Sequence, residues 1–437
     1  MDQLQLTMAK ATALIATART DPGTLHAFRA ELERRILEHP DNRGNVVNRM
    51  LKQRGRHLDP ESLHHHTNHG TLVIHTLPKP NGGQRIIHAP DDKDCANGLL
   101  HLAALTPAAE VTASHLDHGF RPLDQITTPV TQLVHAIQHG YNYIAQLDVE
   151  NCFHHLPLTV PFTGLVPPRT LALLISLHHA WNNSGKGQSR HGFPQGLPQG
   201  HPLSPAYSNI VLNLIIAVVR TDCGTAATII RYADDVTIVA TNANDLRLAA
   251  ELATRHLAEH GMAINPEKTT ITQWKYGAKI SYLGYRIEAG SSGITLAPKP
   301  SAYSRLRDKL ENTTDPGRQL EIITGWLNAF LLTNKQGENT RAIDFIKSLQ
   351  ALRLHPHLLP APRRGAAIHD TPPVACQSRF LDHLDAMVAA RNPHPLPPAP
   401  PAHPANTPRL SDGGPHHIGP PTFAHPPGPF DQSHSTQ

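Results

Sequence analysis

The stretch Thr228-Ile-Ile-Arg-Tyr-Ala-Asp-Asp-Val-Thr-Ile-Val-Ala240 places two adjacent aspartates between two runs rich in β-branched residues. This pattern predicts two strands joined by a sharp acidic turn. An ionised carboxylate is costly to bury unless it is paired or bound to a metal, so Asp234 and Asp235 at the tip of a strand pair indicate a cation site. Mg2+ is the cation that one or two carboxylates commonly hold together with phosphate oxygens.

A partner carboxylate lies earlier in the chain. In Tyr143-Ile-Ala-Gln-Leu-Asp-Val-Glu-Asn-Cys-Phe153, an apolar, strand-like run ends at Asp148, and an aromatic residue follows shortly afterwards. Carboxylates on neighbouring strands of one sheet can hold two divalent ions roughly 3.5–4 Å apart, the arrangement used for in-line phosphoryl displacement. The two motifs together therefore predict a nucleotidyl transferase.

The composition indicates that only part of the chain is packed. The 437 residues are enough for two or three domains, but hydrophobic residues make up only 39% and charged residues 17%. From about residue 391 the sequence is rich in Pro, His and Gly, which predicts a disordered or polyproline-like tail. The net charge of +4 is compatible with a polyanionic partner and does not require one.

The cysteines and histidines favour no structural metal site. The four cysteines are scattered and form no C-x-x-C pair, which fits a reducing cytoplasm, and the 32 histidines lack ligand spacing. We see no signal peptide and no membrane span, so we expect a cytoplasmic protein with no membrane partner. The sequence names no protein partner.

Periodicity and turn signals divide the chain. We expect helices in 1–60, a hairpin of strands 71–76 and 84–88, a helix over 168–181, an irregular Pro- and Gly-rich loop over 192–205 and a helix over 206–220. After the acidic hairpin we expect a helix capped by Asn244 and closed by Gly261, a strand pair within 277–287, and helices from 301 to 352. The predicted divisions are 1–65, 66–295, 296–352, an ambiguous 353–390 and the tail 391–437.

These motifs resemble those of reverse transcriptases, in the family's order, over roughly residues 70 to 335. Tyr232-Ala-Asp-Asp235 matches the Y-x-D-D box, and Asp148 with Phe153 matches the first catalytic motif. Three further boxes are similar to the P-Q-G-x-P-x-S-P box, the lysine motif and the primer grip: Pro198-Gln-Gly-His-Pro-Leu-Ser-Pro205 with Asn209, Asn265-Pro-Glu-Lys-Thr269, and Tyr282-Leu-Gly-Tyr285. One box alone is a weak signal, whereas five in order are a strong one.

Other features resemble bacterial members of the family. His118-Gly-Phe-Arg-Pro122 is similar to a G-F-R-P element of group II intron proteins, and Gly325-Trp-Leu-Asn-Ala-Phe330 to the start of their thumb. His135-Ala-Ile-Gln-His139 resembles the N-A-x-x-H element of retron enzymes, with His in place of Asn. No cysteine-rich endonuclease module follows the thumb motif. These departures favour a stand-alone enzyme of the retron or phage-defence type over a complete mobile intron protein.

The resemblance implies an α+β right-hand polymerase with fingers, a ferredoxin-like palm and a helical thumb. It implies two Mg2+ ions, with Mn2+ as an alternative, bound by Asp148, Val149, Asp234 and Asp235, and it makes Lys268 a general acid for the leaving pyrophosphate. Because side chains alternate along a strand, we expect Asp235 to point away from Asp234 and to be only a supporting ligand.

The resemblance also implies sites for the substrates, namely an RNA template, a DNA or RNA primer and deoxynucleoside triphosphates. The nucleotide site would contain Lys79, Arg85, Phe153, Gln199, Gly200 and Tyr232, with the ring of Phe153 excluding the ribose 2′-hydroxyl. The primer and template would contact Arg121, Leu283 and Gly284.

Simpler roles remain open for several of these residues. Phe153 and Tyr232 could be core aromatics, Lys79, Arg85 and Lys268 could be solvated surface charges, and Arg121 could be structural. At the level of function, two alternatives to an RNA-directed DNA polymerase remain. One is a maturase-like RNA-binding protein derived from a group II intron, and the other is a template-independent or RNA polymerase on the same palm.

Overall fold

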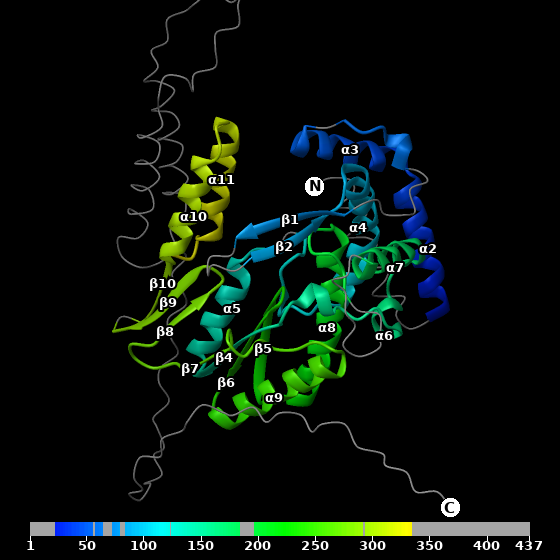
Figure 1. Ribbon diagram of the computed structural model, residues 1–437. Coiled ribbons are helices and arrows are strands. Elements are labelled where there is room, and N and C mark those ends of the chain that lie inside the picture. The colour runs from blue at the N-terminus through cyan, green and yellow to red at the C-terminus, as the bar shows by residue number, and fades with distance from the viewer. Residues whose placement is uncertain are drawn as a thin grey trace, which may run out of the picture. The chain divides into compact units, whose positions relative to one another are not determined.

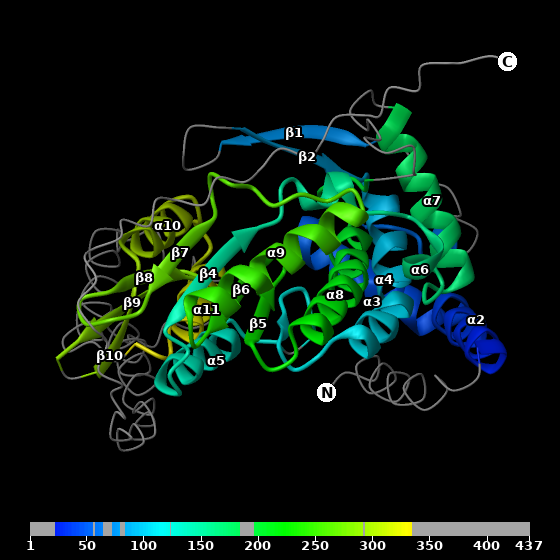
Figure 2. The same ribbon diagram turned by 90° about the horizontal axis from the view of Figure 1, so that it is seen from below.

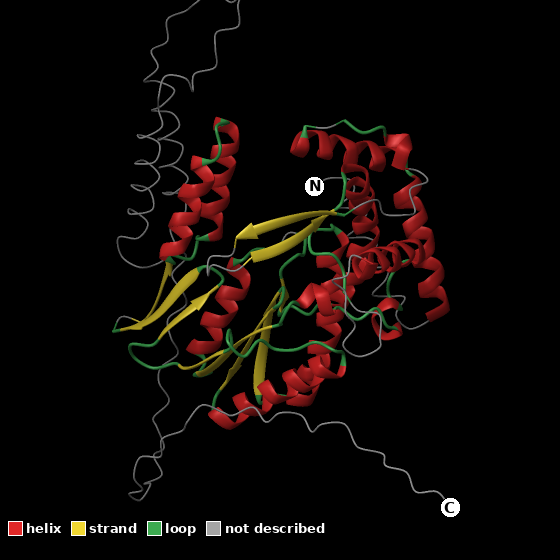
Figure 3. Cartoon of the chain, in the orientation of Figure 1, coloured by secondary structure: helices red, strands yellow, loops and turns green. Residues whose placement is uncertain are grey.

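The computed structural model describes residues 22–55, 57–63, 72–78, 84–122, 124–183, 196–291 and 293–333. These residues form helices together with a two-stranded, a three-stranded and a five-stranded sheet (Figure 3), which confirms the mixed helix and strand composition. Several predictions lie outside the described residues: Lys79 with the hairpin turn 79–83, the ambiguous region 353–390 and the tail 391–437.

The first described part is helical and carries a hairpin, as predicted. Its elements are α2 (Pro22–Glu38), α3 (Pro40–Arg54), a 3-10 turn (Pro60–Leu63), β1 (Val73–Pro78), β2 (Gln84–Ala89) and α4 (Asp92–Thr112). Helices α2 and α3 pack against α4, where Ile36 contacts the Ala103–Ala104 region and Met50 lies in a cluster with Leu100. The strands β1 and β2 pair antiparallel from Val73 opposite Ala89 to Pro78 opposite Gln84.

The central sheet is built from two halves that are far apart in the sequence. Its strands are β3 (Asp117–His118), β4 (Tyr143–Asp148), β5 (Ala227–Tyr232), β6 (Asp235–Ala240) and β7 (Thr270–Gln273), in the order β3-β5-β6-β4-β7. Helix α8 (Leu203–Cys223) precedes β5, and α9 (Ala243–Glu259) joins β6 to β7. The result is a β-α-β-β-α-β arrangement in which β4 and β6 are antiparallel neighbours.

Helices cover both faces of this sheet. Helices α8 and α9 pack on one face, whereas α5 (Thr127–Gln138) packs on the other (Figures 1 and 2). Strand residues therefore alternate between two apolar clusters: Leu147 and Val236 face α8, and Ile144 and Val239 face α5. This alternation explains why the strands read as nearly continuous apolar runs.

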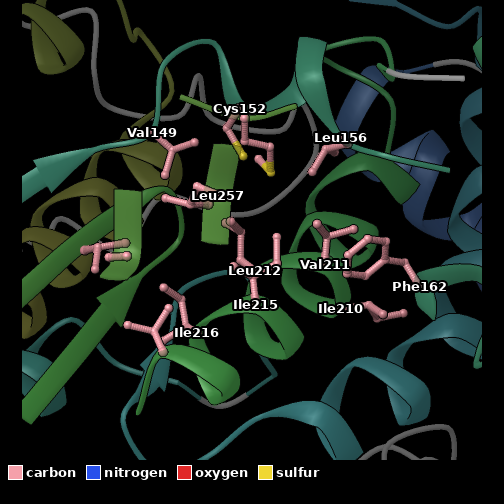
Figure 4. Close-up of a cluster of buried hydrophobic side chains, with 14 of the residues drawn as sticks. Val149, Cys152, Leu156, Phe162, Ile210, Val211, Leu212, Ile215, Ile216 and Leu257 are labelled. Carbon is pink, nitrogen blue, oxygen red and sulfur yellow. The ribbon is translucent and has the colours of Figure 1, made fainter. Parts of the chain in front are cut away.

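Helix α8 is the central helix of the larger cluster. Figure 4 shows Ile210, Val211, Leu212, Ile215 and Ile216 of α8 in the core with Val149, Cys152 and Leu156, which follow β4. This helix is long and apolar enough to cross a membrane, but 72% of its apolar window is buried inside the protein. Its composition is accounted for by packing in the core.

Two predicted helix starts are wrong. Helix α8 begins at Leu203, not 206, because Pro205 is accommodated in the first turn, where a helix needs no backbone N–H from that residue. Helix α9 is capped by Asn242, whose Oδ1 accepts a hydrogen bond from the Asp245 backbone N–H at 2.9 Å, and Asn244 already lies in the helix. Strand β6 ends at Ala240, so the turn into α9 is shorter than predicted.

Between β4 and α8 the chain forms a 3-10 turn (Cys152–His155), α6 (Val160–Thr163) and α7 (Pro168–Asn183). The predicted helix at 168–181 is thus confirmed, and residues 196–202 are irregular as expected. The predicted strand pair at 277–287 corresponds to β8 (Lys279–Tyr282) and β9 (Tyr285–Gly290), and β10 (Gly293–Pro298) completes a three-stranded sheet that was not predicted.

Two helices follow this second sheet. They are α10 (Pro300–Glu311) and α11 (Pro316–Ala329), which confirm the described part of the helices predicted over 301–352, whereas residues 334–352 lie outside the described residues. The Tyr285 hydroxyl donates a hydrogen bond to the Ala329 carbonyl at 2.7 Å, and its ring lies 5.0 Å from that of Phe330. The end of α11 is therefore attached to the start of β9.

A buried charge network lies behind the acidic hairpin. The Arg231 guanidinium, fully buried, contacts Asp117 at 3.2 Å and donates hydrogen bonds to the Ala233 carbonyl at 2.7 Å and to Asn209 at 3.1 Å. Arg220 donates two hydrogen bonds of 2.9 Å to the same Asp117 carboxylate. Burial alone would raise the pKa of Asp117, but the hydrogen bonds from Arg220 and the charge of Arg231 lower it to about 2.

Replacing Asp117 with Leu should strongly destabilise the fold, because it leaves the buried Arg231 charge without its counter-ion. Removal of one partner from a buried ion pair typically costs about 3–5 kcal/mol. Urea unfolding of the purified protein measures this loss. As a control, Asp222→Ala removes an exposed carboxylate that bonds His256, and it should cost less than about 1 kcal/mol. Equal losses for the two variants would contradict this account.

Candidate active site

The acidic hairpin and the end of β4 lie side by side. In the β4–β6 pairing Asp148 is directly opposite Asp235, and the backbone N–H of Val149 donates a hydrogen bond of 3.2 Å to the Asp234 carbonyl. Ala233 has a φ of +54°, which closes the turn between Tyr232 and Asp235. The structure thus brings the three predicted aspartates to one end of the central sheet.

The predicted orientation of Asp235 is wrong. Alternation was expected to point it away from Asp234 and hence away from the site. Asp234 instead lies within the turn, so regular alternation begins only at Asp235, which sits opposite Asp148 on the same face of the sheet. The register therefore makes Asp235 a candidate to share a ligand with Asp148.

The three carboxylates perturb one another. Partial burial, followed by the charges of Asp234 and Asp148, raises the pKa of Asp235 to about 6. Burial and then the charge of Asp148 also raise the pKa of Asp234, while Lys268 and Arg85 act in the opposite direction. The raised pKa values thus reflect burial first and the mutual repulsion of the carboxylates second.

Lys268 provides part of that compensation. Its ammonium group lies 2.9 and 2.8 Å from the two oxygens of Asp148. The loop that carries it is attached to the end of β4, because the Asn265 N–H donates to the Asp148 carbonyl at 2.8 Å and the Glu150 N–H donates to Ala263 at 2.7 Å. The predicted lysine therefore lies against the first predicted catalytic aspartate.

The donor chemistry fits hard divalent cations, because the site contains several carboxylates on adjacent strands and a surplus of negative charge. The Val149 side chain is buried in the core, so only its backbone could reach an ion. Among the described residues, no three His, Cys, Asp or Glu side chains form a ready-made metal site. Lys268 occupies both oxygens of Asp148, so an ion that used these oxygens would have to displace it.

Residues predicted for the nucleotide site come together from two distant segments. The His88 N–H of β2 donates a hydrogen bond of 2.7 Å to the Gln199 carbonyl. Gly200 has a φ of +123°, and a Cβ at this position would lie 2.9 Å from the His88 carbonyl, so glycine is required. Arg85, exposed on β2, is close enough for its charge to act on Asp234. Phe153 is half-buried in the turn after β4.

Tyr232 lies at the end of β5, opposite Asp235 in the register. Its side chain is half-buried, and burial raises its pKa. It thus flanks the three aspartates, as expected for a residue that packs beside the hairpin.

A polar cavity of about 490 Å3 opens beside the aspartates. It lies between the central sheet and β8, and Asp148, Asp235 and Leu283 are among its lining residues. Leu283 and Gly284, with φ values of +45° and +88°, form the tight turn between β8 and β9. The residues predicted to contact the primer therefore adjoin the catalytic candidates.

Arg121 was expected to contact the template, but its side chain is bonded within the protein. Its guanidinium forms a two-point ion pair with Glu110 of α4, at 2.8–3.2 Å, and donates hydrogen bonds to the carbonyls of Ser114 and Asp117. These contacts use its donors within the protein and support the structural role that the sequence left open.

Two charged residues near the site were missed. Lys299 lines the cavity together with Asp235, and its N–H donates to the Gly284 carbonyl at 2.9 Å. Burial lowers the pKa of Lys299. Arg231, next to Tyr232 in the sequence, holds the hairpin from behind. The only sequence signal for Lys299 is its position between two prolines at the junction of a strand and a helix.

In the absence of metal ions, Asp235→Asn should stabilise the protein at neutral pH. The folded pKa of Asp235 is about 6 and its ordinary value is 3.8, so the folded state binds more protons between these values, and stability falls as pH rises through them. The variant should gain on the order of 1 kcal/mol at pH 7 after solvent screening and nothing at pH 4.

Urea unfolding in EDTA at the two pH values measures this gain. Asp308→Asn, on the exposed face of α10, is the control and should show no such pH-dependent difference. A variant that is no more stable than the wild type at pH 7 would contradict the charge crowding.

Part of this chain is similar to known proteins. Residues 77–287 match the family model described as reverse transcriptase (RNA-dependent DNA polymerase). The chain is 28% identical over 274 residues to the retron Mx65 reverse transcriptase of Myxococcus xanthus, a match that covers 60% of this chain and 59% of that protein. The chain thus spans less than two thirds of that relative.

Similar solved structures include two fungal telomerases. Telomerase from Candida albicans, in complex with a fragment of telomeric RNA, aligns with a TM-score of 0.41 and 12% identity, over 80% of this chain and 62% of that one. Apo telomerase from Candida tropicalis aligns with a TM-score of 0.39 and 16% identity, over 71% and 61%. This chain is therefore similar to reverse transcriptases over residues 77–287 and to a bacterial retron enzyme over 274 residues.

Proposed function

We propose that this chain is an RNA-directed DNA polymerase, a nucleotidyltransferase that adds deoxynucleotides to a primer. The observation that carries the proposal is the pairing of Asp148 with Asp235, with Asp234 in the adjoining turn, inside the segment that matches the reverse transcriptase family. A metal-dependent polymerase needs carboxylates grouped at one end of a rigid sheet, and this chain supplies them.

In this proposal the described elements form a right-hand polymerase. The five-stranded sheet with α8 and α9 is a ferredoxin-like palm, the hairpin β1–β2 with the helices around α4 belongs to the fingers, and α10 and α11 begin the thumb. The attachment of α11 to β9 through Tyr285 supports a thumb that is joined to the primer-grip sheet.

Asp148, Asp234 and Asp235, with the Val149 backbone, would hold two Mg2+ ions, or Mn2+ in their place. Bound there, the ions would lower the pKa of the primer 3′-hydroxyl and neutralise the triphosphate. Because ligand carboxylates must be ionised, the raised pKa values of Asp234 and Asp235 would weaken metal binding at mildly acidic pH.

Lys268 and Arg85 would act on the triphosphate. Release of Lys268 from Asp148 when ions bind would free its ammonium group to donate a proton from Nζ to the leaving pyrophosphate. Arg85 would contact the phosphates of the incoming nucleotide, together with Lys79. Gln199 and Gly200 would line the same site, because the Gln199 carbonyl accepts a hydrogen bond from β2 and Gly200 packs closely against His88. The ring of Phe153 would exclude the ribose 2′-hydroxyl.

The template is RNA in this proposal, and the primer is DNA or RNA. On the retron relative, we place the enzyme in the bacterial cytoplasm and propose a role of the retron or phage-defence type. Sequencing the nucleic acid that co-purifies with the protein tests this role. An RNA joined to its own cDNA would support it, whereas intron RNA would point instead to a maturase.

Asp234→Asn should abolish primer extension, because it removes a charged ligand from the metal pair. We expect a loss of at least about 10³-fold in rate, equivalent to roughly 4 kcal/mol of transition-state stabilisation. Extension of a DNA primer on RNA with Mg2+ measures the loss, and EDTA should reproduce it in the wild type. Asp222→Asn, at the far end of α8, is the matched control and should extend normally. Robust synthesis by Asp234→Asn would exclude this mechanism.

Phe153→Ala should relax sugar selection. Wild-type protein should strongly prefer deoxynucleotides, and the variant should incorporate ribonucleotides more readily because the ring no longer blocks the 2′-hydroxyl. Single-nucleotide incorporation assays with both substrates, with and without template, measure the ratio. A wild type that prefers ribonucleotides would favour an RNA polymerase, and addition without template would favour a template-independent enzyme.

A further inference from the structure

Phe120 is an unusual residue beside the candidate active site. It follows β3, its side chain is 53% exposed, and it belongs to no apolar cluster of the described core. Its backbone has a φ of +57°, in the left-handed region, which is strained for a bulky side chain. An exposed aromatic ring in a strained backbone position contributes little to folding, so its placement calls for another explanation.

Hydrogen bonds to Gly119, the residue before Phe120, impose this strained backbone. The Gly119 carbonyl accepts a hydrogen bond of 2.9 Å from the Asn209 side-chain amide. The Gly119 N–H donates one of 2.7 Å to the Asp124 carboxylate. The preceding carbonyl, of His118, accepts from the Ala233 N–H at 2.9 Å. A glycine or asparagine would adopt the same backbone at position 120 with little strain. The backbone conformation therefore does not require phenylalanine, and the phenyl ring must have another role.

The same loop packs directly on the acidic hairpin. A Cβ added at Gly119 would lie 2.7 Å from the Ala233 backbone nitrogen, so the two backbones are in contact with no room for a side chain between them. The base of Phe120 is thus fixed relative to Ala233, the residue just before Asp234. The ring has a rigid support at the catalytic end of the sheet.

The ring itself contacts the candidate sugar gate. The centroids of the Phe120 and Phe153 rings are 6.3 Å apart and the rings are inclined by 54°, within the range of attractive aromatic pairs. Phe153 is only half-buried, in a short 3-10 turn, so it depends on its neighbours to keep its ring in place. Phe120 is the aromatic partner that the structure gives it.

We propose that Phe120 is a specificity-determining residue that supports the ring of Phe153 against the sugar of the incoming nucleotide. This inference rests on the proposed polymerase function and adds a second residue to the gate. A gate excludes a hydroxyl only if it cannot move aside, and the contact with Phe120 restricts that movement. An aromatic pair of this kind corresponds to roughly a two- to tenfold effect on discrimination.

The test compares discrimination in the full-length protein. The ratio of kcat/KM for a deoxynucleotide to that for the matching ribonucleotide is measured on one RNA template for wild type, Phe120→Ala, Phe120→Leu and Phe153→Ala. We expect Phe120→Ala to lower the ratio by roughly two- to tenfold, mainly through faster ribonucleotide incorporation, and Phe120→Leu to lower it less. Ile175→Ala, an exposed apolar residue on α7, is the matched control and should keep the wild-type ratio.

The double variant Phe120→Ala/Phe153→Ala makes the test specific. If Phe120 acts through Phe153, removing it from a protein that already lacks the Phe153 ring should change the ratio no further. Independent, additive effects would overturn the inference. A wild-type ratio in both Phe120 variants would also overturn the inference. So would an equal loss of kcat/KM for both nucleotides together with weaker binding of primer–template, because that result would indicate that Phe120 contacts the template.

The outcomes also separate this inference from the function beneath it. If the wild type extends primers and Phe153→Ala relaxes selection while Phe120→Ala does not, the polymerase stands and the support role falls. If the wild type does not extend primers at all, the proposed function falls and this inference falls with it.

Discussion

The contact on which the site depends is the buried ion pair between Arg231 and Asp117. Arg231 belongs to β5, and its guanidinium also holds the Ala233 carbonyl, so one buried cation joins the sheet, helix α8 and the turn that carries Asp234. A charge without solvent is tolerated only when nearly all its donors are used. Here the ion pair and the hydrogen bonds of Arg231 offset the cost of its burial. They also fix a turn whose carboxylates repel one another.

That repulsion is the second constraint. This end of the sheet would be more stable with fewer acids, yet three lie together, and among the described residues Lys268 is the cation that pairs with the Asp148 carboxylate. Such local strain is typical of sites in which the missing stabilisation is supplied by a ligand. The rigid packing of α8 and α9 under the sheet keeps the carboxylates from moving apart.

The sequence predicted which segments carry the candidate catalytic residues better than it predicted the directions of their side chains. The strands that carry Asp148 and Asp235, the lysine loop and the β8–β9 turn were all located, because each has a strong local signal in periodicity, charge or turn residues. The side on which Asp235 points was missed, because it depends on the positive φ of Ala233. Lys299 and the pairing of Asp117 with Arg231 were also missed. They depend on contacts between segments distant in the chain, which one sequence does not record.

The hydrogen bond from His88 to Gln199 has a mechanical consequence. It couples the β1–β2 hairpin to the residues just before α8, so these two segments, which carry residues proposed for the nucleotide site, are joined as one piece. Any rocking of the hairpin is transmitted to Gln199 and Gly200, and from there to the N-terminal end of the central core helix. If a nucleotide binds as proposed, a movement of the hairpin toward it would therefore carry this end of α8 along.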